Sequence, residues 1–392
     1  MPSKQRATSE PTPKMGKQVD VRRATEADAD AIQRFVRETY GDEAPYKGPD
    51  RWRWQFVNSP FHPADDSAPS VWIAVDDARA VGQIAVQDGR LQLGSDLLDA
   101  GWIVDVMVHP DYRGLRLSHQ IHDAIMLERG ILVTLTMAPA TRRVAERAEC
   151  LTLGPTGRFI QPRRVSGAGL RRWLAHKAQM RPDIAWALNL FRASYVGPTL
   201  LAVFLRAATA VRRRSGEPAS TQGRRLEEVS RFPESYDEFW ESAAPTFPAL
   251  FERTAEFLNW RFCDCPELEY RKFVLYGSDG APCGHLVTRL ATQVELRVGV
   301  IVDMFARADD TTSLSALLAA AEEVLAPAEF LEAAASTPAW QDALSAAGFF
   351  QTHIMRPTVV VRDPGLKARI ASMLDDWHFT KADHDWDQIH PA

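Results

Sequence analysis

The chain has 392 residues, 45% of them hydrophobic, which is enough to bury a large core and to form two domains. Its net charge of −5 gives no indication of a nucleic-acid partner. Residues 1–18 are polar and basic without the apolar segment of a secretory signal, so we expect a disordered tail. The cysteines at 150, 263, 265 and 283 are too few and too irregular for a disulfide framework, so we expect reduced thiols in a cytoplasmic protein.

The first hundred residues predict alternating helices and strands. A short strand over residues 19–22 is followed by a helix that begins with a capping-box pattern at Thr25 and Asp28 and ends at Gly41. A second helical segment covers residues 51–56. Strands follow over residues 71–75 and 81–86, joined by a turn at residues 76–77.

Residues 103–129 hold the most informative pattern in the chain. An apolar run over residues 103–108 predicts a buried strand that Pro110 ends, and residues 116–129 have helical spacing with Gly130 as the stop. A strand, a short glycine-bearing loop and a helix N-terminus together form an anion site, because free N–H groups and the helix dipole meet there. Gly114 lets the backbone approach a phosphate, and Arg113 can add charge-assisted hydrogen bonds.

This stretch resembles the acyl-CoA-binding motif of the GNAT acyltransferase superfamily, Arg/Gln-x-x-Gly-x-Gly/Ala preceded by Val-x-Pro-x-Tyr. Arg113, Gly114 and the small Ser118 fall in register, whereas Arg116 stands where the family has its middle glycine. An arginine there either crowds the pyrophosphate or reaches it. The resemblance implies acetyl-CoA or another acyl-CoA as co-substrate, held by Met107, Val108, Arg113, Gly114, Leu115, Arg116, Leu117 and Ser118. The alternative is an ordinary strand–turn–helix with an exposed Arg-Gly turn.

The order of elements supports the resemblance over about 145 residues. A strand at 131–136, a helix at 141–149 and a strand near 158–160 complete the order of a GNAT domain, which we place at residues 19–166. Residues 167–225 break that order. Residues 184–211 are strongly apolar but are interrupted too often for a transmembrane helix, and three arginines follow at 212–214. We expect a helical insertion that packs against the domains; a helix on an anionic membrane surface is the other interpretation for residues 184–214.

The second half repeats the first. Residues 54–60 match residues 260–266, Gly82 matches Gly284, and residues 103–106 match residues 301–304, with spacings that differ by four residues. Helices near 314–325 and 340–348, a strand at 330–332 and a closing strand at 358–361 follow the same order. We therefore predict an α/β fold (α+β, mixed sheet) of two tandem GNAT-like domains with the insertion between them. The second domain covers residues 226–362.

The second copy differs from the first where phosphates would bind. Its loop lacks the Arg-Gly turn and carries Asp309 and Asp310, and carboxylates beside a phosphate are costly without a cation. We expect this half not to bind CoA. Residues 363–392 form an acidic, aromatic tail that resembles, loosely, the tails of GNAT proteins associated with polysaccharide assembly. We expect it to dock into a groove rather than to bind a metal through His378, Asp383, His384 and Asp385.

Acyl transfer to an amine needs a held thioester, an oxyanion contact and a base. In the family the central strand supplies N–H groups, which places Met107 and Val108 at the oxyanion. Asp105 is a candidate base because burial raises a carboxyl pKa, but its recurrence as Asp303 favours a structural hydrogen bond equally. His109 is an alternative base, as are His119 and His122, and Tyr112 is a candidate acid toward the thiolate.

The leading hypothesis is an acyl-CoA-dependent N-acyltransferase that acts on an amine acceptor. The acceptor would be an amino sugar or sugar nucleotide in cell-surface polysaccharide assembly, a detail that depends on the tail resemblance alone. The alternatives are a Fem-type aminoacyl transferase and a non-catalytic scaffold at the membrane surface, the latter if Arg116 blocks CoA. The sequence gives no oligomeric state, and it predicts a cytoplasmic protein with peripheral membrane contact as an option.

Overall fold

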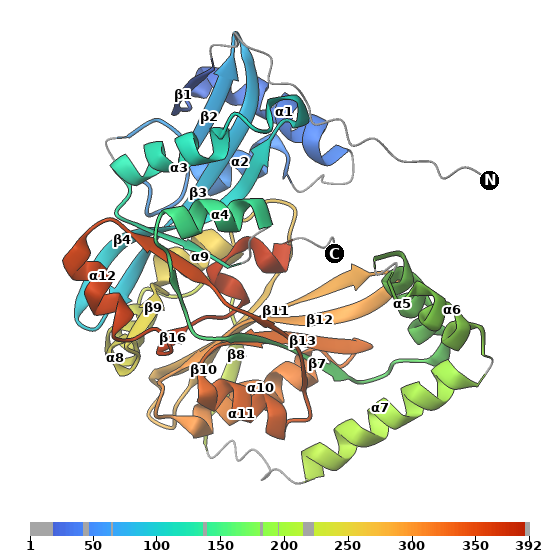
Figure 1. The fold of residues 1–392 in the computed structure, drawn as a ribbon. Coiled ribbons are helices and arrows are strands. Elements are labelled where there is room, and N and C mark those ends of the chain that lie inside the picture. Colours follow the sequence, from blue (N-terminus) through green and yellow to red (C-terminus); the bar gives the residue numbers. More distant parts are fainter. Residues whose placement is uncertain are drawn as a thin grey trace, which may run out of the picture.

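The computed structural model describes residues 19–41, 47–63, 66–135, 139–180, 183–194, 196–214 and 223–388. Two β-sheets organise it (Figure 1). The predicted tail at 1–18 and most of the linker within residues 215–225 lie outside the described residues.

The first lobe is the sheet β1-β2-β3-β4-β5-β15-β6 with its helices. Its strands are β1 (Asp20–Arg23), β2 (Val71–Asp76), β3 (Arg79–Leu93), β4 (Asp96–Val108), β5 (Ile131–Thr134), β15 (Thr358–Val361) and β6 (Leu151–Thr152). Its helices are η1 (Glu26–Asp28), α1 (Ala29–Tyr40), α2 (Pro49–Phe56), η4 (Pro110–Tyr112), α3 (Leu117–Glu128) and α4 (Pro139–Arg147). The predicted capping box is present, since the Asp28 carboxylate accepts the Thr25 N–H at 2.8 Å.

Side chains along β2 point alternately to the two faces of the sheet, and each face is covered by helices. Val71 and Ile73 face one side and pack with residues of α1 and α2, whereas Trp72 and Ala74 face the other side and pack with α3. Both sets are fully buried. The sheet is therefore a middle layer between α1 and α2 on one face and α3 on the other.

The second lobe repeats this strand order as β8-β10-β11-β12-β13-β7-β14. Its strands are β8 (Arg225–Glu228), β10 (Arg271–Tyr276), β11 (Pro282–Gln293), β12 (Leu296–Ala306), β13 (Phe330–Ala335), β7 (Thr156–Pro162) and β14 (Phe350–Met355). Its helices are α8 (Tyr236–Ala243), η5 (Ala244–Thr246), α9 (Ala255–Phe262), α10 (Thr311–Val324) and α11 (Pro338–Ala346). The predicted mixed α/β fold is confirmed.

The two halves exchange one strand each. β7 follows the first half of the chain but pairs with β13 and β14, and β15 follows the second half but pairs with β5 and β6. The sequence pattern predicts the strand near residues 158–160 in the first domain and the strand at 358–361 in the second domain. In the structure each of these strands belongs to the other sheet, so both assignments are corrected. Residue pattern predicts that a segment is a strand, whereas the sheet edge with which it pairs depends on tertiary structure.

Two tryptophans related by the repeat join the lobes. Trp54 and Trp260 stack with ring centroids 4.7 Å apart. Each indole N–H donates to the other residue's carbonyl oxygen, at 2.9 Å from Trp54 and 3.1 Å from Trp260. Equivalent residues that contact each other reciprocally are the signature of a two-fold relation.

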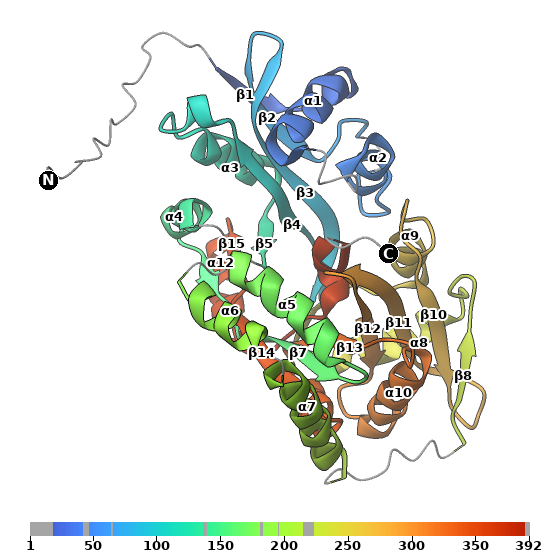
Figure 2. The same cartoon turned by 90° about the vertical axis from the view of Figure 1, so that its right-hand side faces the viewer.

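The insertion is formed by α5 (Gly167–Met180), α6 (Ala185–Ala193) and α7 (Gly197–Arg214). Figure 2 shows it in front of β7 and β14 of the second lobe. Leu170 and Leu174 of α5 pack with Ala202 of α7, and Phe330 of β13 packs against the same cluster, so the insertion contacts the second lobe as the packing interpretation predicted. No single described helix is long and apolar enough to cross a membrane; α6 and α7 pass that test only as a pair bent by 95°.

The chain ends in a tail with α12 (Pro364–Ala371), β16 (Trp377–His378), η6 (Lys381–Asp383) and η7 (Asp385–Gln388). β16 pairs with β9 (Ala249–Phe251), which pairs with β3, so the tail returns to the junction of the lobes. Trp377 and Phe379 are almost completely buried there. The tail is thus a packed part of the fold.

Candidate active site

The central strands of the first lobe separate at the place the sequence predicted for the co-substrate. β4 and β5 pair only at Gly101 with Leu132 and at Trp102 with Val133, and then they diverge. The His109 N–H bonds to the Val81 carbonyl on β3 at 2.9 Å. Because amides alternate along an antiparallel strand, the Val108 N–H points away from β3, into the gap between β4 and β5.

A β-bulge lies just before this point. Gln83 pairs with Met107 and Ala85 pairs with Val104, so Ile84 alone faces Asp105 and Val106. Asp105 has a φ of 52°, in the left-handed region. A bulge redirects the backbone and side chains of a strand, and here it separates the paired part of β4 from the residues at the gap.

The loop before α3 has the backbone of an anion-binding turn. Gly114 has a φ of 94°, and an added Cβ would meet nothing within 4 Å. Arg116 has φ 56° and ψ 29°, so the position where the family carries glycine is left-handed here too. A residue other than glycine costs about 1–2 kcal/mol in that conformation, so the arginine is held there against a backbone preference.

The side chains of this loop divide into two groups. Arg113 and Arg116 are exposed, and no described residue pairs with either guanidinium. Leu117 is buried under the sheet, and Leu115 and Ser118 are half-buried. Met107 is also buried, on the α1 and α2 side of the sheet. Leu117 can therefore serve a ligand only through its backbone, and the backbone groups of Met107 point toward β3 by the same alternation. The arginines can serve a ligand through charge.

Asp105 forms an ion pair with Lys47, a residue that the sequence analysis did not select. Asp385 of the tail lies 3.9 Å from the same ammonium and also pairs with His384 at 2.6 Å. Burial alone would lower the pKa of Lys47, but Asp105 and Asp385 outweigh it and raise the pKa above its usual range. The Asp105 carboxylate therefore faces a cation.

The two other predicted catalytic residues lie near the loop and have protein partners. The Tyr112 hydroxyl donates to the Asp76 carboxylate, and the ring is 4% exposed. The His109 ring accepts the Asp111 N–H at 3.2 Å, and its second nitrogen lies 3.1 Å from Arg79. The predicted roles of these residues as acid and base stay predictions. Of the alternatives, His122 is buried, and burial lowers its pKa.

In the second lobe, the loop and helix N-terminus that correspond to this site are occupied by the protein's own side chains. The Asp310 carboxylate accepts the Ser313 N–H at 2.9 Å, so the N-terminus of α10 is capped by the protein itself. Asp309 pairs with Arg307 at 3.0 Å. A carboxylate at the helix N-terminus leaves no place for a phosphate there.

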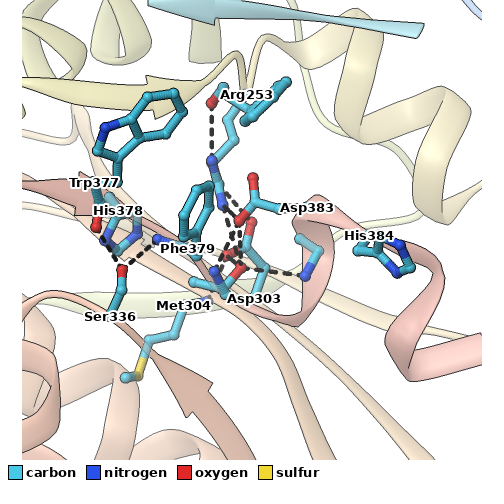
Figure 3. Close-up of polar contacts among 12 residues, drawn as sticks. Arg253, Asp303, Met304, Ser336, Trp377, His378, Phe379, Asp383 and His384 are labelled. Carbon is cyan, nitrogen blue, oxygen red and sulfur yellow. Dashed lines mark hydrogen bonds and ion pairs between the residues drawn. The ribbon is translucent and has the colours of Figure 1, made fainter. Parts of the chain in front are cut away.

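In the second lobe η6 of the tail contacts both β12 and β13. Figure 3 shows Asp383 of η6 beside Arg253 and Asp303. Thr380 donates to Asp303 at 2.8 Å, and Asp383 accepts from Arg253 at 2.7 Å. Arg253 donates to Asp303 at 3.0 Å as well. Burial acts to raise the pKa of Asp303, but Arg253 and His285 hold it well below its usual range. The groove into which the tail docks therefore lies between β12 and β13 of the second lobe.

The tail residues considered for a metal have other partners. Asp383 pairs with Arg253, Asp385 with His384, and His378 accepts from or donates to the Thr337 hydroxyl at 2.7 Å. Among the residues that the structure describes, no group of three or more His, Cys, Asp or Glu side chains is placed to hold a metal ion.

Comparison with known families agrees with this geometry. Residues 20–142 match the family model of the acetyltransferase (GNAT) domain. The matched segment lies in the first lobe. The matched segment includes the bulge, the gap and the loop, and it supports the predicted class of enzyme, an acyltransferase. A search of curated proteins finds no match.

Solved structures with the same fold cover both lobes. A conserved protein of Enterococcus faecalis, described as a probable N-acyltransferase, matches with a TM-score of 0.57 at 9% identity over 88% of this chain and 73% of its own. A GCN5-related N-acetyltransferase of Anabaena variabilis matches at 0.54 and 11% identity over 88% and 73%. Saccharomyces cerevisiae N-myristoyltransferase with bound myristoyl-CoA matches at 0.54 and 13% over 90% and 82%. At such identities the likeness concerns the fold.

Proposed function

We propose that the protein is an acyl-CoA-dependent N-acyltransferase whose first lobe binds the co-substrate and whose second lobe does not. The observation that carries the proposal is the contrast between two helix N-termini. The loop before α3 presents Arg113 and Arg116, whose guanidinium groups have no partner among the described residues, whereas the N-terminus of α10 is capped by Asp310. The pyrophosphate would lie on the amides of residues 114–118 and between the arginines.

The rest of the co-substrate would follow the gap between β4 and β5. The Val108 N–H, which points into that gap, would donate a hydrogen bond to the thioester oxygen as negative charge develops on it. The attacking amine must lose a proton, and His109 and Asp105 are the candidates for receiving it. We propose Tyr112 as the residue that returns a proton to the thiolate, which requires its bond to Asp76 to break.

For the acceptor we propose an amine, with an amino sugar or sugar nucleotide of cell-surface polysaccharide assembly as the candidate class. This detail depends on the tail resemblance alone. The Fem-type and scaffold alternatives make a different prediction, because neither requires binding of CoA. The E. faecalis and A. variabilis neighbours, described as N-acyl- and N-acetyltransferases, support the acyl-transfer class.

Thermal-shift titration with CoA, acetyl-CoA and longer acyl-CoAs tests the proposal. We expect stabilisation of the full chain by at least one of these ligands, and Arg113→Ala to weaken that binding about 10- to 100-fold, because it loses a charge-assisted contact to phosphate. Arg307→Ala is the matched control, since Arg307 stands in the corresponding loop of the second lobe and pairs with Asp309. No shift with any CoA, or equal losses in the two variants, would contradict the proposal.

We further propose that α6 and α7 contact an anionic membrane surface. Trp186 is 72% exposed and Phe204 is 65% exposed, and Leu190, Val196, Leu200 and Val211 are exposed as well. Residues 184–216 include five arginines and no aspartate or glutamate. Exposed apolar side chains that include a tryptophan, in a segment with arginines and without carboxylates, suit the boundary between acyl chains and anionic headgroups.

Liposome flotation tests this contact. The protein should float with vesicles that contain anionic lipid, and the double variant Trp186→Ser/Phe204→Ser should stay at the bottom. Leu127→Ser is the control, because Leu127 is 71% exposed on α3 of the first lobe. Wild-type protein that does not float with anionic vesicles would rule the contact out.

A further inference from the structure

A large cavity lies between the second sheet and the insertion. Its volume is about 660 Å³, within the 300–1,000 Å³ that small-molecule sites occupy. Strands β7, β12, β13 and β14 form its floor, and α5 and α7 form its roof. Figure 2 shows these helices lying over β7 and β14. The cavity belongs to the lobe whose gap is filled by the tail, so it is separate from the candidate active site.

The walls of the cavity are mostly hydrocarbon. On the sheet, Ile160, Phe330 and Val298 face it from neighbouring strands. On the helices, Leu201 and Leu205 of α7 and Trp173 of α5 face it from the other side. Such a lining favours a ligand that is itself apolar along most of its length.

The lining of the cavity includes the cationic side chains Arg158 and Lys177 and the carboxylate Glu332. Glu332 pairs with Arg158, at 2.5 Å, and with Lys381, which lies outside the lining. Burial raises the pKa of Glu332, yet Lys381 and Arg158 bring it down to about 2, so it stays ionised with two cations. Lys177 also lines the cavity; its ammonium lies over the Trp173 ring at 5.4 Å, and no carboxylate of a described residue pairs with it.

The two faces of α7 have different surroundings. Leu201 and Leu205 face the cavity, whereas Leu200 is 63% exposed and Phe204 is 65% exposed on the outer side. The apolar interior is therefore separated from a second, exposed apolar surface by a single helix.

We propose that this cavity binds a single-chain amphiphile with an anionic head group, its hydrocarbon chain between the sheet and α7 and its head beside Lys177. The site is additional to the acyl-CoA site and does not depend on acyl transfer.

Binding of palmitate to the delipidated full chain, measured by displacement of a fluorescent fatty acid, tests the proposal. Leu201→Trp fills the cavity and should weaken binding at least about tenfold, whereas Leu200→Trp, on the outer face of the same helix, should bind like the wild type. Leu205→Phe is a second filling variant should Leu201→Trp lower the unfolding temperature. Lys177→Gln should weaken palmitate about fivefold and leave hexadecanol, which has the same chain and no charge, unchanged.

Two controls separate this site from the others. Arg113→Ala and saturating CoA should leave palmitate binding unchanged, because both concern the first lobe. Trp186→Ser/Phe204→Ser should also leave it unchanged, because those side chains lie on the exposed surface. The proposal is overturned if wild-type protein does not bind palmitate, if the two filling variants bind like the wild type, or if CoA displaces the fatty acid.

Discussion

Lys47 and Arg253 occupy the same position in the two halves, seven residues before Trp54 and Trp260 respectively. Each pairs with the aspartate of its own central strand, Lys47 with Asp105 and Arg253 with Asp303. The sequence showed both aspartates but not their partners, although the constant distance to the repeated tryptophan was a usable signal. An ion pair present in both lobes, including the lobe closed by its own tail, favours a structural role for Asp105 over a role as base.

His378 is the residue whose titration should most affect stability. It is completely buried against Phe247 and Trp340, and one ring nitrogen has no partner among the described residues. Burial, with a smaller contribution from Arg253, lowers its pKa from 6.5 to about 3. Because the unfolded chain binds this proton first, stability is complete above pH 6.5 and falls as pH decreases toward 3, by about 1.4 kcal/mol per pH unit.

His378→Gln should remove this dependence. Urea unfolding at pH 7.5 and 5.5 should show the wild type losing about 1.4 kcal/mol more than the variant between the two pH values. The comparison uses the change with pH, so any loss of packing common to both pH values cancels. Equal pH dependence in the two proteins would show that His378 does not stay neutral in the fold.

At the scale of elements, the tail packs between β12 and β13 of the second lobe. It does so through three polar contacts: Thr380 with Asp303, Lys381 with Glu332, and Asp383 with Arg253. The corresponding strands of the first lobe, β4 and β5, pair at two positions and then separate. The sequence predicted a docking tail from its aromatic residues. The groove was not predictable, because it is formed by two strands whose separation no local pattern records.

Arg253→Met should destabilise the protein by about 3–5 kcal/mol, because it removes the cation that pairs with buried Asp383 and one of the two basic partners of buried Asp303. Arg271→Met, which removes an exposed pair with Glu228, should cost less than about 1 kcal/mol. Chemical denaturation of the two variants measures both values. Similar small losses would mean that the tail is not anchored through Arg253.

The helices and strands themselves were largely predictable. The expected helix over 116–129 corresponds to α3 at Leu117–Glu128, and the strand at 358–361 to β15 at Thr358–Val361. Apolar periodicity and a glycine or proline stop were sufficient for these elements. The left-handed backbone of Arg116 was not predictable from its own residue type, since only the resemblance to a glycine-bearing motif pointed to it.

For the whole molecule, the exchange of β7 and β15 makes the lobes mutually dependent. Each sheet is completed by a strand from the other half of the chain. Trp54 of the first lobe and Trp260 of the second lobe stack on each other at the interface. In the first lobe β4 and β5 pair at two positions and the described residues do not cap the N-terminus of α3, whereas in the second lobe η6 contacts β12 and β13 and Asp310 caps α10. This asymmetry supports the proposal that the first lobe binds the co-substrate and that the second lobe does not.

Isothermal titration of the full chain with an acyl-CoA tests that claim most directly, because it counts the sites. We predict one molecule bound per chain, with binding weakened by Arg113→Ala and unchanged by Arg307→Ala. Two molecules per chain, or one that Arg307→Ala and not Arg113→Ala weakens, would contradict it.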